Sequence, residues 1–135
     1  MIGVVVITHG QFGQELLRTA QDIVGRQESV AALAVTPEMG PGNVSEMLDD
    51  TLKRLASPEG TLVIVDMLGG TPCNTALLKT KSFPIEVLTG ANLYMLLSSF
   101  THRAQMDLKS LAAKVAEDGR RAIVSANDLL MKRLS

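Results

Sequence analysis

The chain has 135 residues, of which 46% are apolar and 20% charged, and its formal net charge is −1. This length and composition predict one globular domain over residues 1–135, not a disordered chain. The near-neutral charge and the 3% aromatic content exclude a basic nucleic-acid surface with stacking platforms. No apolar run is long enough to span a membrane. Cys73 is the only cysteine, which excludes an internal disulfide and suits a reducing compartment.

Strand-like and helix-like patterns alternate along the first half of the chain. Runs rich in Val and Ile predict strands buried on both faces, and apolar residues at helical spacing predict helices between them. Asn43 followed by Glu46 resembles a capping box, and Gly25 stands where a helix ends. The expected order is a strand over residues 2–7, a helix over 12–24, a strand over 30–35, a loop over 36–42 and a helix over 44–55.

The second half continues the alternation. Asn92 and Asp107 are expected to cap two helices, with Gly119 ending the second of them. The expected order is a strand over 61–65, a turn over 69–72, a helix to about residue 79, a strand over 85–88, the two capped helices, a short strand over 122–124 and a short helix over 129–134.

Strands that alternate with helices predict an α/β fold: a doubly wound, three-layer sandwich with a mainly parallel central sheet. In such sheets, ligands bind beyond the carboxyl ends of the strands. The candidate site therefore comprises the residues that follow the first and third predicted strands.

His9 ends the first strand and Asp66 ends the third. If the two strands are neighbours, the carboxylate can accept a hydrogen bond from one imidazole nitrogen and leave the other nitrogen as a free nucleophile. An ordinary imidazole has a pKa of about 6.5, so its neutral form is available near pH 7. Taken singly, His9 is equally well explained as the polar end of a strand, and Asp66 is better explained as a helix cap or turn former; their joint placement favours chemistry.

A Gly69-Gly70-Thr71-Pro72 turn follows Asp66. Thr71 is expected as the helix N-cap and Pro72 as the first helical residue. The paired glycines allow close backbone approach, and free N–H groups at a helix start attract anions such as a phosphoryl group. A plain strand-to-helix turn explains the tetrapeptide by itself. The expected phosphoryl-binding residues are Thr8, Gly10, Gly69, Gly70 and Thr71.

The other reactive side chains are weaker candidates. His102 lacks a placed partner and is expected at the surface, and Cys73 is expected to be buried and inert. The methionines are expected to fill the core. No metal-ligand spacing, P-loop or nucleophile elbow is present, so we expect neither a metal nor a cofactor.

The two segments 2–10 and 66–72, with Asn74 just beyond, resemble the IIA domain of the mannose-family sugar phosphotransferase system over nearly the whole chain. The resemblance implies a cytoplasmic phosphocarrier that accepts a phosphoryl group from HPr on His9, oriented by Asp66. It then passes the group to a IIB component, and membrane contact is only indirect, through IIC and IID. The chain contains no IIB domain, so a stand-alone IIA is expected.

The resemblance also implies a homodimer in which a C-terminal strand, around residues 121–125, is exchanged between subunits. Two features depart from the family pattern. Met67-Leu68 occupies a stretch where many relatives carry an aromatic residue, and the loop over 36–42 is rich in Gly and Pro. Both are expected near the partner surface, where they bear on the identity of the IIB partner.

Three alternatives remain at this stage. The protein could be a regulator whose phosphorylation reports on carbon supply and which serves no transporter. It could be the related phosphotransfer subunit of dihydroxyacetone kinase. It could also be a small-molecule binding module that uses the same sheet, in which case it would bind anions without carrying an acid-labile phosphate on His9.

Overall fold

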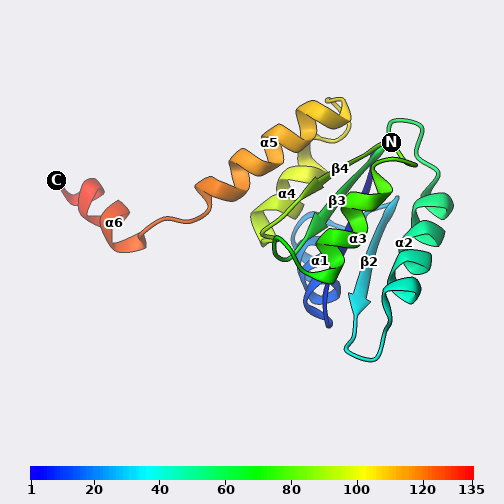
Figure 1. Cartoon of the computed structure of the whole chain (residues 1–135). Helices are drawn as coiled ribbons and strands as arrows, with labels where there is room; N and C mark the ends of the chain where they lie inside the picture. Colours follow the sequence, from blue (N-terminus) through cyan, green and yellow to red (C-terminus); the bar gives the residue numbers. More distant parts are fainter.

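The computed structural model describes all residues from 1 to 135 and has the predicted α/β architecture (Figure 1). None of its helices is both long enough and apolar enough to cross a membrane. The elements in chain order are β1 (Gly3–His9), α1 (Phe12–Val24), β2 (Val30–Val35), α2 (Pro41–Leu55), β3 (Thr61–Val65), α3 (Thr71–Lys79), β4 (Ile85–Leu88), α4 (Leu93–His102), α5 (Leu108–Arg121) and α6 (Ala126–Leu134).

The sheet is parallel throughout, and its strand order is β2-β1-β3-β4. The chain moves from β1 to one side to form β2, and then crosses to the other side to form β3 and β4. The strand order therefore reverses between β1 and β3. Such a reversal opens a crevice at the carboxyl ends of the two strands, which is where open α/β sheets bind their ligands.

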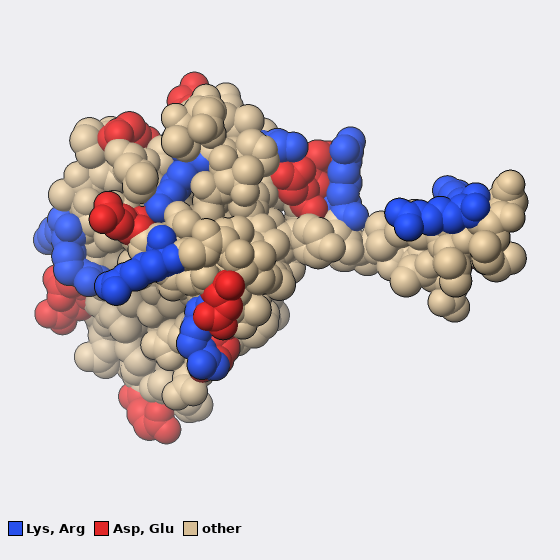
Figure 2. Space-filling view, turned by 180° about the vertical axis from the view of Figure 1, so that it is seen from behind, with Lys and Arg blue, Asp and Glu red and all other residues tan.

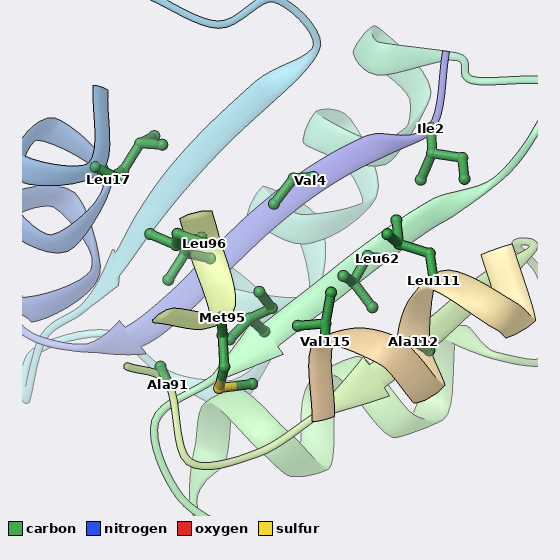
Figure 3. Packing of buried hydrophobic residues seen from close by; sticks show 13 residues of the cluster. Ile2, Val4, Leu17, Leu62, Ala91, Met95, Leu96, Leu111, Ala112 and Val115 are labelled. Carbon is green, nitrogen blue, oxygen red and sulfur yellow. The ribbon is translucent and has the colours of Figure 1, made fainter. Parts of the chain in front are cut away.

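Helices cover both faces of the sheet, which confirms the predicted three layers (Figure 1). Successive residues of β1 alternate between the two cores: Val4 and Val6 pack on one face, and Val5 and Ile7 on the other. All four are fully buried. The first core lies between the sheet and α1, α4 and α5 (Figure 3), and the second lies beneath α2 and α3.

Two predicted helix starts were wrong. Helix α2 begins at Pro41, so the preceding loop is shorter than the predicted 36–42. Asn43 lies within the first turn, where its side chain accepts a hydrogen bond from the Gly40 N–H at 3.0 Å. Helix α3 is capped by Gly70, and Thr71 is its first residue. Pro fits the first turn of a helix because the N–H groups of that turn have no acceptor within the helix, so the N–H that Pro lacks is not needed.

The predicted caps of α4 and α5 are confirmed. The Asn92 side chain accepts from the Met95 N–H at 3.1 Å, and the Asp107 side chain accepts from the Ser110 N–H at 2.8 Å. Gly119 does not end α5, which continues to Arg121. A Cβ atom at Gly119 would lie 2.6 Å from Cγ of Met95, so this glycine instead allows α5 to pack closely on α4.

The predicted strand over 122–124 was also wrong for the single chain. These residues pair with no strand, and they lead into α6, which begins three residues before the predicted range 129–134. Figure 1 shows the end of α5 and α6 projecting away from the body as an arm. A strand requires a neighbour for its hydrogen bonds, and the arm does not reach the sheet of its own chain.

Candidate active site

The ends of β1 and β3 place His9 beside Asp66. Ile7 of β1 is paired with Val65 of β3, so Asp66, the first residue after β3, lies level with the last residues of β1. The His9 backbone N–H donates to Oδ2 of Asp66 at 2.9 Å, and the ring Nδ1 of His9 lies 2.7 Å from the same oxygen. The structure thus brings together the two residues that the sequence placed at separate strand ends.

Hydrogen bonds determine the charge of the Asp66 carboxyl. Burial by itself raises the pKa of this group, but donation from the His9 backbone and ring and from the Met67 N–H outweighs burial and lowers the pKa below its ordinary value. The Met67 N–H binds the second oxygen, Oδ1, at 2.9 Å. Asp66 is therefore ionised at neutral pH and can only accept hydrogen bonds.

The ionised carboxylate sets the tautomer of His9. Because Oδ2 can only accept, the proton of a neutral His9 ring resides on Nδ1, and Nε2 carries the free lone pair. The His9 side chain is 51% exposed, whereas that of Asp66 is 15% exposed. The carboxylate therefore lies beneath a ring that a reactant can reach from solvent.

The Gly69-Gly70 loop adjoins the ring on its other side. Gly69 has a φ of +88°, a left-handed conformation that glycine adopts without strain. Asn74, in the first turn of α3, fixes the loop: its side chain donates to the Gly69 carbonyl at 3.2 Å and its backbone N–H to the Gly70 carbonyl at 2.9 Å. The N–H groups of Gly69 and Thr71 donate to no protein group, so they remain available to an anion at the positive end of α3.

Two of the predicted phosphoryl-binding residues have other contacts. Thr8 is fully buried, and its hydroxyl accepts from the Gly13 N–H at 2.8 Å, at the start of α1. Neighbouring residues of a strand point to opposite faces, so Thr8 points away from the face on which His9 lies. The Gly10 N–H donates to the Val35 carbonyl at 2.8 Å. Gly70 therefore adjoins the ring, with Gly69 and Thr71 on either side of it in the chain, whereas Thr8 and Gly10 make contacts within the scaffold.

Sequence reasoning gave Asn74 no role, although it noted this residue as part of the motif. The signal was available: an Asn in the first turn after a Gly-Gly pair can hold the carbonyls of that turn. Among the exposed apolar side chains next to the site, Met67-Leu68 is the stretch expected near the partner surface, whereas Phe12 was predicted only as part of the first helix. Phe12 is 50% exposed, Met67 55% and Leu68 74%.

The remaining reactive side chains lie elsewhere. The Nδ1 atom of His102 lies 3.0 Å from the Ser98 carbonyl of its own helix, and the residue is half-buried rather than at the surface as predicted. Cys73 is a buried free thiol, as predicted. No group of three or more His, Cys, Asp or Glu side chains is arranged to hold a metal ion.

Comparison with protein families gives a match over residues 3–116 to the EIIA-man family, described as the fructose IIA component of the phosphotransferase system. The mannose-specific EIIAB component of Escherichia coli is 31% identical over 124 residues, which cover 90% of this chain. The alignment spans only 38% of that longer relative. The fructose-specific EIIA component of Bacillus subtilis is 29% identical over 112 residues, covering 82% of this chain and 77% of the relative.

Solved structures agree with these matches. Phosphotransferase system component EIIA from Streptococcus agalactiae superposes with a TM-score of 0.86 at 29% identity, covering 95% of this chain and 99% of that one. The mannose/sorbose-specific IIA subunit from Enterococcus faecalis gives a TM-score of 0.84 at 30% identity, covering 92% of this chain and 93% of the other.

Proposed function

Because this chain belongs to the mannose-type family of IIA components of the sugar phosphotransferase system, we propose that it is a phosphohistidine carrier that accepts a phosphoryl group on Nε2 of His9. In this proposal HPr is the donor, a IIB component is the acceptor, and the exchange takes place in the cytoplasm. The observation that carries the proposal is the pair of contacts from the His9 backbone N–H and ring Nδ1 to one oxygen of Asp66.

The choice of Nε2 follows from these contacts. Nδ1 is engaged by Asp66, so Nε2 supplies the electron pair that attacks phosphorus. As the bond from His9 Nε2 to phosphorus forms, the bond from phosphorus to the donor nitrogen breaks and its electron pair returns to the donor. The proton on Nδ1 stays in place, and the positive charge that develops on the His9 ring is stabilised by the Asp66 carboxylate.

The loop after Asp66 supports the other half of the reaction. In the proposal, the phosphoryl oxygens face the free N–H groups of Gly69 and Thr71 at the start of α3. Transfer between two histidines depends on positioning and on electrostatic stabilisation of the transferred group. The residues at the site supply both.

Exposed apolar side chains beside the site suit protein partners. Phe12 follows His9 by three positions, and Met67 and Leu68 directly follow Asp66. Large exposed apolar side chains close in sequence to site residues suit a protein-binding surface. We propose that HPr and the IIB component both cover this group while they exchange the phosphoryl group, and that Met67 and Leu68 help to select the IIB partner.

The C-terminal arm supports the proposed homodimer. No residue of α6 is buried, and a nine-residue helix is marginal in water without tertiary contacts. One side of the arm carries basic side chains, whereas much of its remaining surface is uncharged (Figure 2). Its exposed apolar residues are Ile123, Val124, Leu129, Leu130, Met131 and Leu134. We propose that this surface packs on a second copy of the chain, beside the unpaired edge of β4.

The family match and the mannose and fructose relatives are the reason to prefer transport to the dihydroxyacetone kinase alternative. Incubation with enzyme I, HPr and labelled phosphoenolpyruvate tests the proposal. The intact chain should gain an acid-labile phosphate and the His9→Ala variant should gain none. His102→Ala removes the other histidine and should be labelled normally. Normal labelling of a folded His9→Ala protein would overturn the proposal.

A further inference from the structure

The two glycines of the loop after Asp66 are needed for different reasons. Gly69 has a φ of +88° and no atom within 4 Å of the position that a Cβ would take. Gly70 has a φ of −81° and a ψ of 173°, an extended conformation that any residue adopts. Backbone conformation thus accounts for glycine at position 69 but not at position 70.

At position 70 there is no room for a side chain. A Cβ atom on Gly70 would lie 2.7 Å from Cε1 and 3.3 Å from Nε2 of His9. The first distance is shorter than real Cβ contacts, and the second is tighter than most of them. The missing side chain therefore leaves room for one edge of the imidazole, and that edge includes the proposed nucleophile.

We propose that Gly70 is a positioning residue: its bare backbone holds the His9 ring on one edge while the Asp66 carboxylate holds it on the other. The effect on phosphoryl transfer rests on the proposed function, whereas the constraint on the ring does not. The ring is half exposed to solvent, yet it is confined between a charged acceptor and a backbone segment.

Neither the Asp66 carboxylate nor the Gly69-Gly70 loop can move easily to make room for a larger side chain. Asp66 is held in place by the N–H groups of His9 and Met67, at 2.9 Å each. The loop is held by the two hydrogen bonds that Asn74 makes to the Gly69 and Gly70 carbonyls. A methyl group at position 70 would therefore displace the imidazole, lengthen its contact with Asp66 and crowd Nε2.

Substitution of Gly70 by Ala tests this constraint directly. In nitrogen-15 NMR spectra of the unphosphorylated protein, the intact chain should show the Nδ1–H tautomer with a hydrogen-bonded Hδ1 proton. Gly70→Ala should lose that Hδ1 signal through exchange with water. Gly69→Ala strains the turn without touching the ring and should retain the signal. Retention of the signal in Gly70→Ala, or equal loss in both variants, would overturn the inference.

A double-mutant cycle provides a second test that needs no activity. Gly70→Ala should lower the Tm of the intact chain, but should lower it much less in a His9→Ala background, because the clash then disappears. An equal drop in both backgrounds would show that the methyl group meets something other than the ring, and would overturn the inference.

Phosphorylation by HPr is the third measurement. Displacement of a reacting group by about 1 Å can cost on the order of 100-fold in rate, so Gly70→Ala should slow labelling by about 10- to 100-fold. Gly42→Ala, placed in α2 where a Cβ meets no atom within 4 Å, should not slow it. If the intact chain is not labelled at all, the proposed function fails while the NMR and Tm measurements still decide the role of Gly70. A normal rate in Gly70→Ala would overturn that role.

Discussion

One carboxylate oxygen of Asp66 binds both the backbone N–H and the ring Nδ1 of His9, at 2.9 and 2.7 Å. The orientation of the imidazole is therefore set relative to the backbone of β1 and not only relative to a neighbouring side chain. Such an arrangement is possible because β1 and β3 are adjacent, parallel and in register. It provides an oriented ring, a defined tautomer and a negative charge beneath a nitrogen that can become positive.

The charge of Asp66 should matter more than its shape. Asp66→Asn keeps an oxygen acceptor for the backbone N–H but removes the negative charge that stabilises the phosphorylated ring. We expect phosphorylation by HPr to slow by about 100- to 1000-fold, the range found when one electrostatic contact is removed from an active site. The initial rate of labelling measures this. Asp22→Asn, on an exposed part of α1, is the control and should label normally. An unchanged rate in Asp66→Asn would show that the carboxylate does not assist transfer.

The pH dependence of stability should report on the same carboxylate. Burial raises the pKa of Asp66, but its hydrogen bonds lower it further, so the pKa in the folded protein lies below the unfolded value of about 3.9. A lowered pKa contributes stability that is fully present above the unfolded value and is lost as the pH falls through the folded value. The free energy of unfolding should therefore drop on acidification to about pH 3.

Urea unfolding of the intact chain and of Asp66→Asn, at neutral and at acid pH, measures this contribution. The loss on acidification should be smaller in Asp66→Asn. It should not vanish, because Asp107 and Asp118 also have lowered pKa values. Hydrogen bonds donated by Ser110 lower the pKa of Asp107, and a hydrogen bond donated by the Ser98 hydroxyl lowers the pKa of Asp118. An equal loss in both proteins would contradict the assignment.

Arg103 should be a major contributor to stability, far from the site. It is 4% exposed and donates to the Ile2 carbonyl at 3.1 Å and to the Glu28 carbonyl at 2.7 Å. Arg103→Met keeps the apolar stem but leaves the buried Ile2 carbonyl and the partly buried Glu28 carbonyl without these donors, at a cost of about 3 kcal/mol in the free energy of unfolding. Urea unfolding measures it. Arg18→Met, at a side chain 72% exposed, should change stability by less than about 0.5 kcal/mol. Equal effects would mean that the Arg103 contacts contribute little.

Removal of the arm should separate assembly from folding. Deletion of residues 123–135 removes the exposed apolar surface of the arm but none of the core residues. We expect the intact chain to be a dimer by light scattering and the shortened chain to be a monomer with a native far-UV spectrum. A shortened chain that still dimerises would place the interface elsewhere, and a monomeric intact chain would leave the arm without its proposed partner.

Local patterns were enough to predict most elements. Strands β1 to β4 follow runs of Val, Ile and Leu, and the Asn92 and Asp107 caps are local contacts three residues apart. The starts of α2 and α3 were misplaced because Gly40 and Gly70 occupy the N-cap positions, although residue types that cap helices better follow each of them within three positions. The strand over 122–124 was wrong because its apolar pattern is local, whereas a strand also needs a neighbouring strand, and none pairs with these residues.

By itself, the sequence determined that a histidine and an aspartate end two buried strands, and that a glycine pair follows the aspartate. Hydrophobic periodicity and strand-end residues are properties of neighbouring positions, so they can be read without a fold. The tertiary structure alone decided that these two strands are adjacent and bring together residues 57 positions apart. It also decided that Thr8 faces α1 and that Gly70 meets the ring. Strand order and side-chain contacts arise from packing between distant segments, which no local pattern contains.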